Sequence, residues 1–552
     1  IIITAGFKEV GNIEWEKKLI EIAKKYNIRI LGPNCLGYGD TNIWLNLSFG
    51  GKFFDKGNIG IISQSGAMAV AITDVLASRN LGFSTFFSLG NKADIDESDI
   101  LLELSEDPNT TVIAMYLESI SRGKVFIENL KKLNNKKPII IMIGGVSEKG
   151  KIATASHTGS LSWNKLMYEA AISEGNGILT YSLAEFFDLV QIFSLNWIQE
   201  LIWEPIIITN AGGIWVLATD QADFYNLSIA KINTDTSNSI KINMPSMMSI
   251  RNPIDIIGDA DSTRVGQLLS NISKVKNKAD LIFLFTVQAT TDIDEIAKVI
   301  VNFQKSHKNY NIFVGLIGGN TIESAKGILN NAGIFVVSST ESVIGWYAKL
   351  LEWKKWKPKK ILPTPHISRS WESVSILMDQ DQTEKLLSEY NLQTSNTNEC
   401  KNIRSVLEYA KKVSGPYVIK ISWKHIAHKT ELGWVIGPIY TEDEIISAYN
   451  MIEWNMEKYL PNEKMEWVSI GRYIISSPTI ELFFGAKRDP IFGETFIIGA
   501  GGIFLTILDD TRIHIGKWDV PTILSILESL RSYPALCGYR KQQKANIGTL
   551  AK

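Results

Sequence analysis

Several features that mark other classes of protein are scarce in this chain. It has three cysteines, Cys35, Cys400 and Cys537, which are far apart and form no metal-type pair. They fit a reducing cytosol better than a disulfide scaffold. The longest apolar runs, such as residues 281–287, are far too short to span a membrane. The formal net charge is −1, so no global field favours nucleic acid or an anionic membrane. We therefore expect a cytoplasmic protein that binds neither.

The chain also lacks a secretory signal and begins with Ile rather than Met. Because it opens directly on a strand-like run, we expect a fragment whose first segment is missing. The length of 552 residues suggests three or four domains. A hydrophobic content of 45% and a charged content of 21% are ordinary for a soluble globular protein.

Histidine is scarce as well, with six residues, and His157 has a distinctive setting. It follows an apolar run at residues 138–143 that predicts a buried strand, and its neighbours are Ala, Ser, Thr and Gly. Ligands collect beyond the carboxyl ends of strands in open α/β sheets. An imidazole with small neighbours has room to attack a phosphoryl or acyl group, so His157 is a candidate nucleophile. A loop histidine hydrogen-bonded to backbone is the alternative.

Two stretches of the chain have a pattern that suits anion binding, in which a short strand, a loop of small residues and a helix start follow one another. Their candidate phosphate-binding residues are Ser63, Ser65 and Gly66 in the first, and Asn210, Gly212 and Gly213 in the second. Unpaired amides and the helix dipole attract anions at such a start. A plain N-cap by Ser63 or Ser65 is the alternative. Two such helix starts aimed at one histidine would hold a phosphohistidine.

Glu118 directly follows a predicted strand at residues 111–117, on the same edge as His157. A carboxylate there would accept a proton from the imidazole, fix its tautomer and stabilise a charged adduct. A solvated loop glutamate is the commoner case.

Strands alternate with helices up to residue 352, which predicts parallel α/β domains. A Lys- and Pro-rich linker follows. Beyond it, the strand lysine Lys420, glycine-rich strand ends and the acid pair Asp509 and Asp510 suit a metal–nucleotide site. Taken singly, each of these is as readily structural.

The motifs, taken in this order, resemble the NDP-forming acyl-CoA synthetases (acetate–CoA ligase, ADP-forming), relatives of succinyl-CoA synthetase. The segments that carry the resemblance are 32–37, 58–67, 116–120, 155–160, 209–213, 252–255, 420–437 and 481–510. The resemblance implies an α/β chain with a partial Rossmann CoA-binding domain, two flavodoxin-like parallel α/β domains and an ATP-grasp domain. The implied boundaries are 1–55 for the C-terminal half of the Rossmann domain, 56–198 for the flavodoxin-like domain with His157, 199–352 for the second flavodoxin-like domain, 353–370 for the linker, and 371–552 for an incomplete ATP-grasp domain.

The resemblance further implies an acid–thiol ligase that interconverts acyl-CoA, ADP and phosphate with a carboxylic acid, CoA and ATP. Phosphate attacks the thioester to give an acyl phosphate, and His157 takes the phosphoryl group. Glu118, which matches the family's Tyr-x-Glu motif, would pair with that imidazole. His428 would relay phosphate between His157 and the nucleotide.

The remaining implied roles concern the substrates, Mg²⁺ and assembly. Asn34 would contact CoA, and Asp509 or Asp510 would lie near Mg²⁺. The residues expected to bind ATP or ADP are Lys420, Glu481, Gly501 and Gly502. The expected partners are small molecules, with homo-oligomers as the expected assembly. A non-catalytic CoA- or nucleotide-sensing module, like the regulatory halves of some acyltransferase fusions, is the alternative function.

The chain departs from the family pattern in two ways. His425 stands where Asp is usual and Thr506 where Glu is frequent, which weakens the Mg²⁺ assignment. Tryptophan stands where the pattern has glycine at Trp44, Trp163, Trp215, Trp434 and Trp467, with Trp15 and Trp203 as further candidates. Glycine sites that need positive φ or close approach do not accept tryptophan. We hypothesise that UGA codons meaning glycine in the source organism were rendered as tryptophan; UGG codons at these positions in the gene would refute this.

Overall fold

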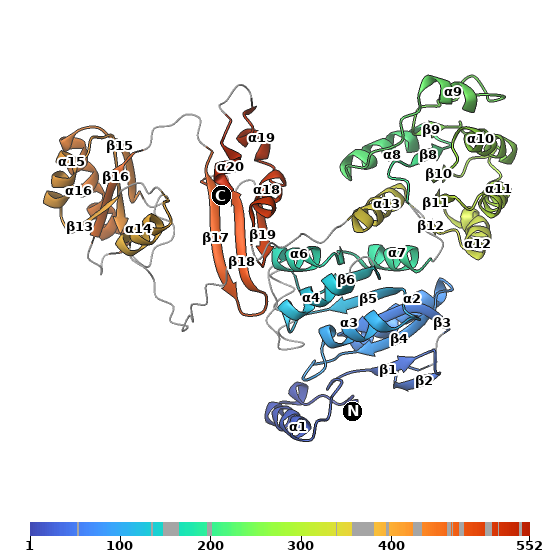
Figure 1. Ribbon diagram of the computed structural model, residues 1–552, viewed down its shortest axis with the longest axis horizontal. Coiled ribbons are helices and arrows are strands. Elements are labelled where there is room, and N and C mark those ends of the chain that lie inside the picture. The colour runs from blue at the N-terminus through green and yellow to red at the C-terminus, as the bar shows by residue number, and fades with distance from the viewer. Residues whose placement is uncertain are drawn as a thin grey trace. The chain divides into compact units, whose positions relative to one another are not determined.

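The structure is a computed structural model of the chain. It describes residues 1–51, 55–133, 136–146, 165–195, 201–337, 339–355, 380–392, 397–422, 433–460, 465, 467–473, 480–502, 510–516, 518–539 and 544–551. These residues form four sheets in two compact units (Figure 1). The first unit comprises Ile1–Leu362, Leu482–Pro534 and Ala545–Lys552, and the second comprises Pro363–Glu481 and Ala535–Lys544.

The first sheet has seven strands in the order β2-β1-β4-β3-β5-β6-β7. Their bounds are β1 Gly37–Asp40, β2 Leu45–Ser48, β3 Lys56–Ser63, β4 Phe83–Ser88, β5 Val112–Leu117, β6 Ile139–Ile143 and β7 Ile178–Thr180. The last five strands are parallel, and β1 joins β4 in the antiparallel sense. Strands β1 and β2 (residues 37–48) therefore form one edge of this sheet. The sequence assigned these residues to the Rossmann half, and the other strands to the first flavodoxin-like domain.

Helices cover both faces of this sheet, as expected for buried parallel strands that read as continuous apolar runs. Their bounds are α2 Gly66–Ser78, α3 Glu97–Glu106, α4 Gly123–Leu133, α6 Lys165–Glu174 and α7 Leu183–Ser194. Helices α2 and α7 pack into one hydrophobic cluster, and α3, α4 and α6 pack into another on the opposite face. Before the sheet, the chain forms η1 (Lys8–Val10) and α1 (Ile13–Lys25). The opening run, which reads as a strand, meets the segment after α1 in one parallel bridge, Ile2 to Leu31.

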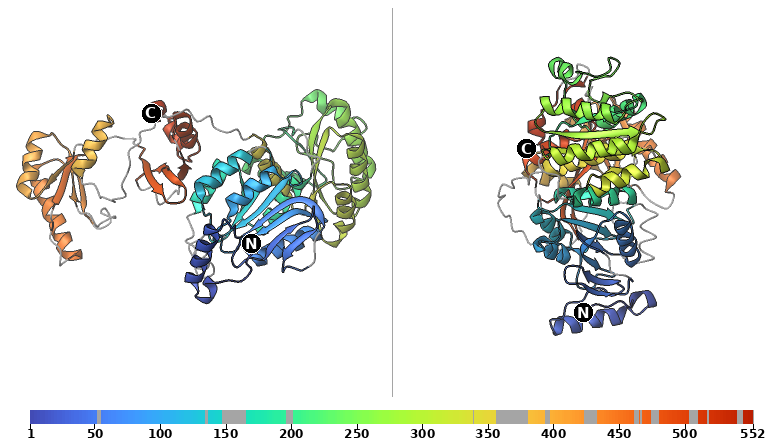
Figure 2. Two further views of the ribbon diagram at one scale, coloured as in Figure 1. Left: turned by 60° about the horizontal axis from the view of Figure 1, so that its bottom comes forward. Right: turned by 90° about the vertical axis from the view of Figure 1, so that its right-hand side faces the viewer.

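The second sheet is parallel, with the order β12-β11-β10-β8-β9. Its strands are β8 Ile206–Thr209, β9 Ile254–Asp255, β10 Ala279–Thr286, β11 Tyr310–Ile317 and β12 Val336–Val337. Its helices are α8 Gly212–Phe224, α9 Thr234–Ile240, α10 Ser262–Val275, α11 Ile293–Ser306, η2 Asn320–Ile322, α12 Glu323–Asn331 and α13 Thr340–Lys355. Helices α8 and α13 share a hydrophobic cluster with α2 and α7 of the first sheet, while α10 to α12 cover the opposite face (Figures 1 and 2).

A three-stranded antiparallel sheet, β17-β18-β19, also belongs to the first unit although it lies far along the chain. The bounds are β17 Leu482–Asp489, β18 Gly493–Ala500, β19 Thr511–Ile515, α18 Val520–Glu528, α19 Tyr533–Leu536 and α20 Ile547–Leu550. Strand β19 packs against α6. The hydrophobic cluster that α3, α4 and α6 form on one face of the first sheet also includes Phe492 and Ile515.

The second unit holds a four-stranded antiparallel sheet in the order β13-β16-β14-β15. The bounds are β13 Asn398–Cys400, β14 Tyr417–Ser422, β15 Val435–Ile439, β16 Trp467–Arg472, α14 Gln380–Glu389, α15 Ile403–Lys412 and α16 Glu442–Tyr459. Helices α15 and α16 close its core.

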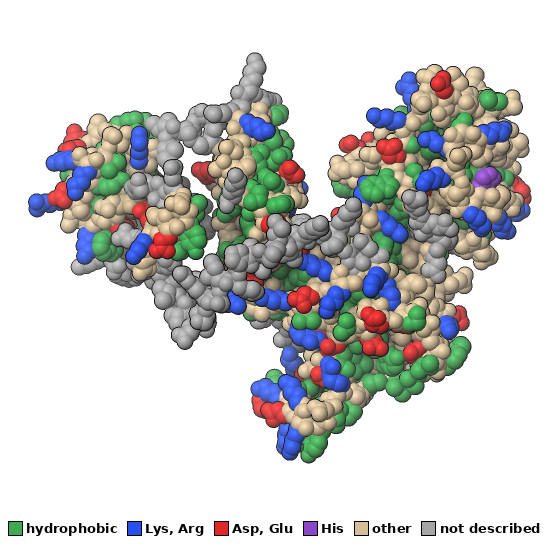
Figure 3. All heavy atoms as spheres, viewed as in Figure 1, with side chains coloured by type: hydrophobic (Ala, Val, Ile, Leu, Met, Phe, Trp, Pro, Cys, Tyr) green, Lys and Arg blue, Asp and Glu red, His purple; other side chains and the backbone are tan. Residues whose placement is uncertain are grey.

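The surface agrees with the balanced composition. On the face seen in Figure 3, Lys and Arg side chains are interspersed with Asp and Glu. Within the described ranges, no helix is long and apolar enough to cross a bilayer. All three cysteines lie in described segments and none is in a disulfide.

Candidate active site

The first predicted helix start is present where β3 ends and α2 begins. Ser65 caps α2, because its hydroxyl accepts a hydrogen bond from the Met68 amide at 3.3 Å. The Ser63 hydroxyl is buried and donates to the carbonyl of Ser65 at 2.7 Å. Ser65 is therefore the N-cap that the alternative interpretation names, and Ser63 stabilises the loop through the Ser65 carbonyl. A cap satisfies only part of the amide set at a helix start, so the Gly66 end of α2 still offers the geometry that binds anions.

Glu118 lies beside this helix start, because β3 and β5 are neighbouring parallel strands with Ser63 opposite Tyr116. Gln64 joins the two strand ends. Its backbone amide donates to the Tyr116 carbonyl at 2.9 Å, and its side-chain oxygen accepts from the amides of Glu118 at 2.8 Å and Ser119 at 3.1 Å. Burial, and to a smaller extent the Glu118 carboxylate, raise the pKa of Tyr116.

The segment that carries His157 leaves the sheet next to Glu118. Its first residue, Gly144, follows β6, and the Gly144 amide donates to the Leu117 carbonyl at 2.8 Å. A side chain at position 144 would place its Cβ 2.8 Å from the Tyr116 hydroxyl and 3.8 Å from Cγ of Glu118. The segment ends at Lys165, the first residue of α6. His157 itself lies outside the described residues.

A buried ion pair supports the turn that follows Glu118. The Lys92 ammonium lies 2.9 Å from the Glu97 carboxylate, and their side chains are 3% and 0% exposed. Lys92 also donates to the Ser119 carbonyl at 2.6 Å, and Glu97 accepts from the Ser121 amide at 2.7 Å. Sequence reasoning selected neither Gln64 nor this pair, although the position of Gln64 between the two selected serines was a usable signal.

The second predicted helix start is present at α8. Its N-cap residue, Ala211, makes no side-chain cap, and a Cβ at Gly213 would meet no atom within 4 Å. Asn210 is buried, and its side chain forms a pair of hydrogen bonds with the Thr286 backbone, at 2.9 and 3.0 Å. Any contact of this loop with an anion would therefore come from the backbone at Gly212 and Gly213.

Asn34 lies in a left-handed turn with φ of 57°. Its backbone amide donates to the Ala5 carbonyl at 3.0 Å, and its side chain donates to Glu9 at 3.1 Å. These contacts hold the turn at this position.

The predicted nucleotide residues fall in both units. Lys420 is exposed on β14 of the second unit. Glu481 ends the longer of the two chain segments that form this unit, Pro363–Glu481. Gly501 and Gly502 follow β18 in the first unit. His428 and Asp509 lie outside the described residues.

Asp510, the described half of the predicted Mg²⁺ pair, is engaged by backbone. Its two carboxylate oxygens accept from the amides of Arg531 and Ser532, each at 2.8 Å. Burial acts to raise the pKa of Asp510, but the hydrogen bonds from Ser532 and Arg531 outweigh it and hold that pKa below its usual value. In the described part of the chain, no group of three or more His, Cys, Asp or Glu side chains is placed to hold a metal. These residues alone therefore do not form a Mg²⁺ site.

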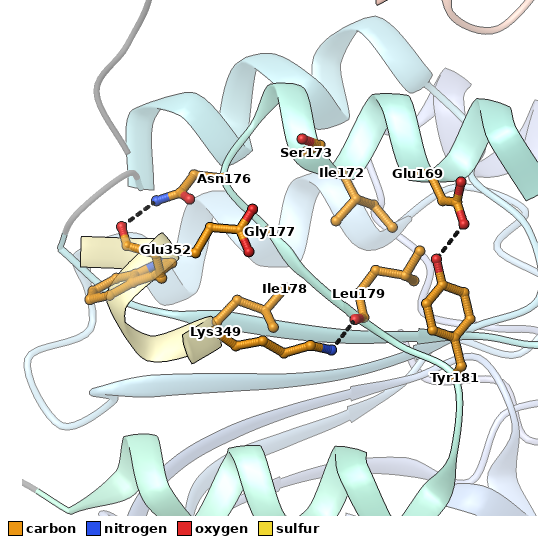
Figure 4. Close-up of a pocket in the computed structure, with 11 residues that line it drawn as sticks. Glu169, Ile172, Ser173, Asn176, Gly177, Ile178, Leu179, Tyr181, Lys349 and Glu352 are labelled. Atoms are coloured by element: carbon orange, nitrogen blue, oxygen red, sulfur yellow. Dashed lines mark hydrogen bonds between the residues drawn. The ribbon is translucent and has the colours of Figure 1, made fainter. Parts of the chain in front are cut away.

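A pocket of about 310 Å³ lies where α6 and β7 meet α13 (Figure 4). Three hydrogen bonds line it, from Tyr181 to Glu169, from Lys349 to the carbonyl of Leu179, and from Asn176 to the carbonyl of Trp353. Two of them join α13 to the first sheet and its helices. The pocket is next to the C-terminal half of α6, whereas the His157 segment meets the N-terminus of this helix. It is a junction between the two parallel sheets rather than part of the candidate active site.

Two segments of the chain match known protein families. Residues 56–193 match the succinyl-CoA ligase like flavodoxin domain, and residues 372–552 match an ATP-grasp domain. An acetate–CoA ligase (ADP-forming) from Methanocaldococcus jannaschii is 37% identical over 99% of this chain and 80% of its own length. A 4-hydroxybutyrate–CoA ligase (ADP-forming) from Nitrosopumilus maritimus is 30% identical over 100% of this chain and 81% of its own length.

A solved structure agrees with these matches. The dinucleotide forming acetyl-coenzyme A synthetase 1 of Candidatus Korarchaeum cryptofilum, in complex with phosphate and ADP, has a TM-score of 0.61 and is 35% identical, covering 64% of this chain and 77% of that chain. Identity at this level across most of a ligase's length shows common ancestry and a common fold. The chain therefore belongs to the family of ADP-forming acyl-CoA synthetases, and it is an acid–thiol ligase.

Proposed function

We propose that this ligase interconverts acyl-CoA, ADP and phosphate with a carboxylic acid, CoA and ATP, with His157 as the phosphoryl carrier. A phosphate oxygen attacks the thioester carbonyl, and the CoA thiolate leaves and is protonated. A ring nitrogen of His157 then attacks phosphorus in the acyl phosphate, and the carboxylate leaves. Transfer of the phosphoryl group from the ring to ADP gives ATP and restores the imidazole. His428 is proposed as the relay to the nucleotide.

One observation carries this proposal: Glu118 lies between the start of α2 and the point where the His157 segment leaves the sheet. Gly144, at that point, approaches both Tyr116 and Glu118. A carboxylate placed there would accept the proton of the imidazole and favour the charged, phosphorylated ring. The amides at Ser65–Gly66 and Gly212–Gly213 would hold the phosphoryl oxygens.

The other proposed contacts follow the family motifs. Asn34 would contact CoA, and Lys420, Glu481, Gly501 and Gly502 would contact the nucleotide. Mg²⁺ would neutralise nucleotide phosphate charge, with Asp509 and Asp510 as its proposed neighbours. The matches to residues 56–193 and 372–552 support two of the proposed domains, the flavodoxin-like domain at 56–198 and the ATP-grasp domain at 371–552.

The proposed setting is a homo-oligomer in the cytoplasm. Three free thiols suit a reducing compartment. Light scattering on the purified chain tests the assembly state, and a monomeric mass would contradict the oligomer.

Labelling with γ-³²P-ATP and Mg²⁺ tests the carrier. We expect acid-labile, base-stable label on His157, which is the behaviour of a phosphoramidate, and no label in the His157→Asn variant. A chain that binds CoA and nucleotide but takes no label would contradict the proposal and favour the sensing alternative.

Because the relatives act on acetate and on 4-hydroxybutyrate, a panel of acids assayed for CoA-dependent ATP use identifies the substrate.

A further inference from the structure

The Gln64 side chain connects the end of β3, where α2 begins, with the backbone of Glu118 and Ser119. It is 7% exposed, and its side-chain amide also donates to the Ser119 hydroxyl at 3.3 Å. Only an oxygen can accept from the two backbone amides of Glu118 and Ser119, so these contacts fix the orientation of the Gln64 amide group. The next residue along the chain, Ser65, caps α2. Gln64 thus links the backbone of Glu118 to the start of α2, in addition to the pairing of β3 with β5.

The turn after Glu118 is held from a second side by the buried Lys92–Glu97 pair. Lys92 fixes the Ser119 carbonyl and Glu97 fixes the Ser121 amide. Gln64 follows β3, Lys92 lies in the loop between β4 and α3, and Glu97 is the first residue of α3, so the turn is supported from the ends of two strands. Buried polar groups with complete partners restrict a segment to one conformation.

We infer that Gln64 is a positioning residue for Glu118 in the thioester half of the reaction, and that the Lys92–Glu97 pair completes the support. This inference rests on the proposed function. Gln64 touches no reacting atom in this assignment; it sets the position from which the Glu118 carboxylate meets His157. A displacement of the order of 1 Å is enough to cost about 100-fold in rate.

Gln64 is the better residue to vary, because removing one partner of a buried ion pair is strongly destabilising. Gln64→Met keeps side-chain length and loses every polar contact of the side chain. Gln64→Glu retains an acceptor for the two backbone amides. Asn271→Leu is the matched control: Asn271 is buried in α10, beside the second sheet, and its side chain donates to the carbonyls of Ile240 and Ile242 at 2.9 and 2.8 Å.

The experiment measures two rates of His157 labelling in the full chain. One uses γ-³²P-ATP with Mg²⁺, and the other uses acyl-CoA with ³²P-phosphate. For Gln64→Met we expect the thioester-driven rate to fall by about 10- to 100-fold and the ATP-driven rate to stay within about twofold. Gln64→Glu should recover part of the loss. Asn271→Leu should lower thermal stability and change neither rate by more than about twofold.

Four results would overturn the inference. Equal losses in both rates, or no loss in either, would show that Gln64 is structural only. A thioester-driven loss of the same size in Asn271→Leu would show that instability is the cause. If the wild-type chain takes no label on His157 from either donor, the proposed function fails and this inference fails with it.

Discussion

Backbone conformation at Trp44 agrees with the hypothesis that some tryptophans replace glycine. Trp44 lies in the turn between β1 and β2 with φ of 55°, and its side chain is 71% exposed. Most other described non-glycine residues with positive φ are asparagine, which tolerates this region. A bulky residue there is strained by roughly 1–2 kcal/mol, and glycine is not.

We expect Trp44→Gly to raise the free energy of unfolding by about 1 kcal/mol, because relief of strain exceeds the entropy cost of glycine. Trp15→Gly is the control, since Trp15 lies inside helix α1 and is also exposed. The control should lower stability by about 1 kcal/mol. Denaturant titration measures both, and a loss of stability in Trp44→Gly would contradict the strain.

Trp434, another tryptophan at a family glycine position, lies in the core of the second unit. It is 1% exposed and packs edge-on against Tyr459 at a centroid distance of 6.3 Å. Within the described residues its indole N–H has no hydrogen-bond partner. A buried donor without a partner costs about 1–3 kcal/mol.

Trp434→Phe should therefore leave the free energy of unfolding unchanged or raise it by up to about 1 kcal/mol, since the lost ring contact is offset by removal of that donor. Trp215→Phe serves as the comparison, because the Trp215 indole donates to the Pro253 carbonyl at 2.6 Å. It should lose about 1 kcal/mol. A larger loss in Trp434→Phe than in Trp215→Phe would show that the donor is satisfied in solution.

At the scale of elements, the turn between β17 and β18 fixes the C-terminal sheet to the first sheet. Phe492 is 1% exposed and packs edge-on against Tyr168 of α6 at 6.4 Å. Glycine at position 123 permits this approach, because a Cβ there would lie 2.4 Å from the Phe492 ring. Asp489 holds the turn by accepting from the amides of Ile491 and Phe492 at 2.9 and 3.0 Å.

Phe492→Ala should loosen this contact, because a buried phenylalanine truncated to alanine costs about 3–5 kcal/mol. Amide hydrogen exchange should then rise in β17, β18 and β19. Phe484→Ala in the same hairpin is the control, since Phe484 is 45% exposed and should leave exchange unchanged. Equal exchange in the two variants would contradict the assigned role of Phe492.

Asp510 links β19 to the turn after α18, and its effect depends on pH. Its pKa is lower in the folded chain than in the unfolded chain, so its stabilisation is fully present above about pH 4 and is lost as pH falls through the folded pKa. Asp510→Asn should lower the melting temperature equally near neutral pH and near pH 5.5, and by less below about pH 4. A deficit that shrinks already between neutral pH and about pH 5.5 would contradict the lowered pKa.

For the whole molecule, local patterns predicted the alternation of strands and helices because buried parallel strands read as apolar runs. The two helix starts were predictable for the same reason, as small-residue loops directly after such runs. The long-range contacts were not. The ion pair between Lys124 and Glu494 joins residues 370 positions apart, and no local pattern encodes it.

Gln64 was missed for a related reason. Its partners are backbone amides 54 and 55 positions away, and backbone leaves no trace in side-chain identity. Glu118, by contrast, was selected because it directly follows a recognisable strand. The sequence thus indicates which residues lie at the carboxyl ends of the parallel strands. The fold shows which of them, such as Gln64, bind the backbone of their neighbours.

The central claim is that one imidazole exchanges a phosphoryl group with both the nucleotide and the thioester. Partitioning of the isolated ³²P-phosphoprotein tests it most directly. Added ADP should return the label as ATP, and added acid plus CoA should release it as phosphate with an equal amount of acyl-CoA. Label that transfers to ADP but is not released by acid and CoA would contradict the account.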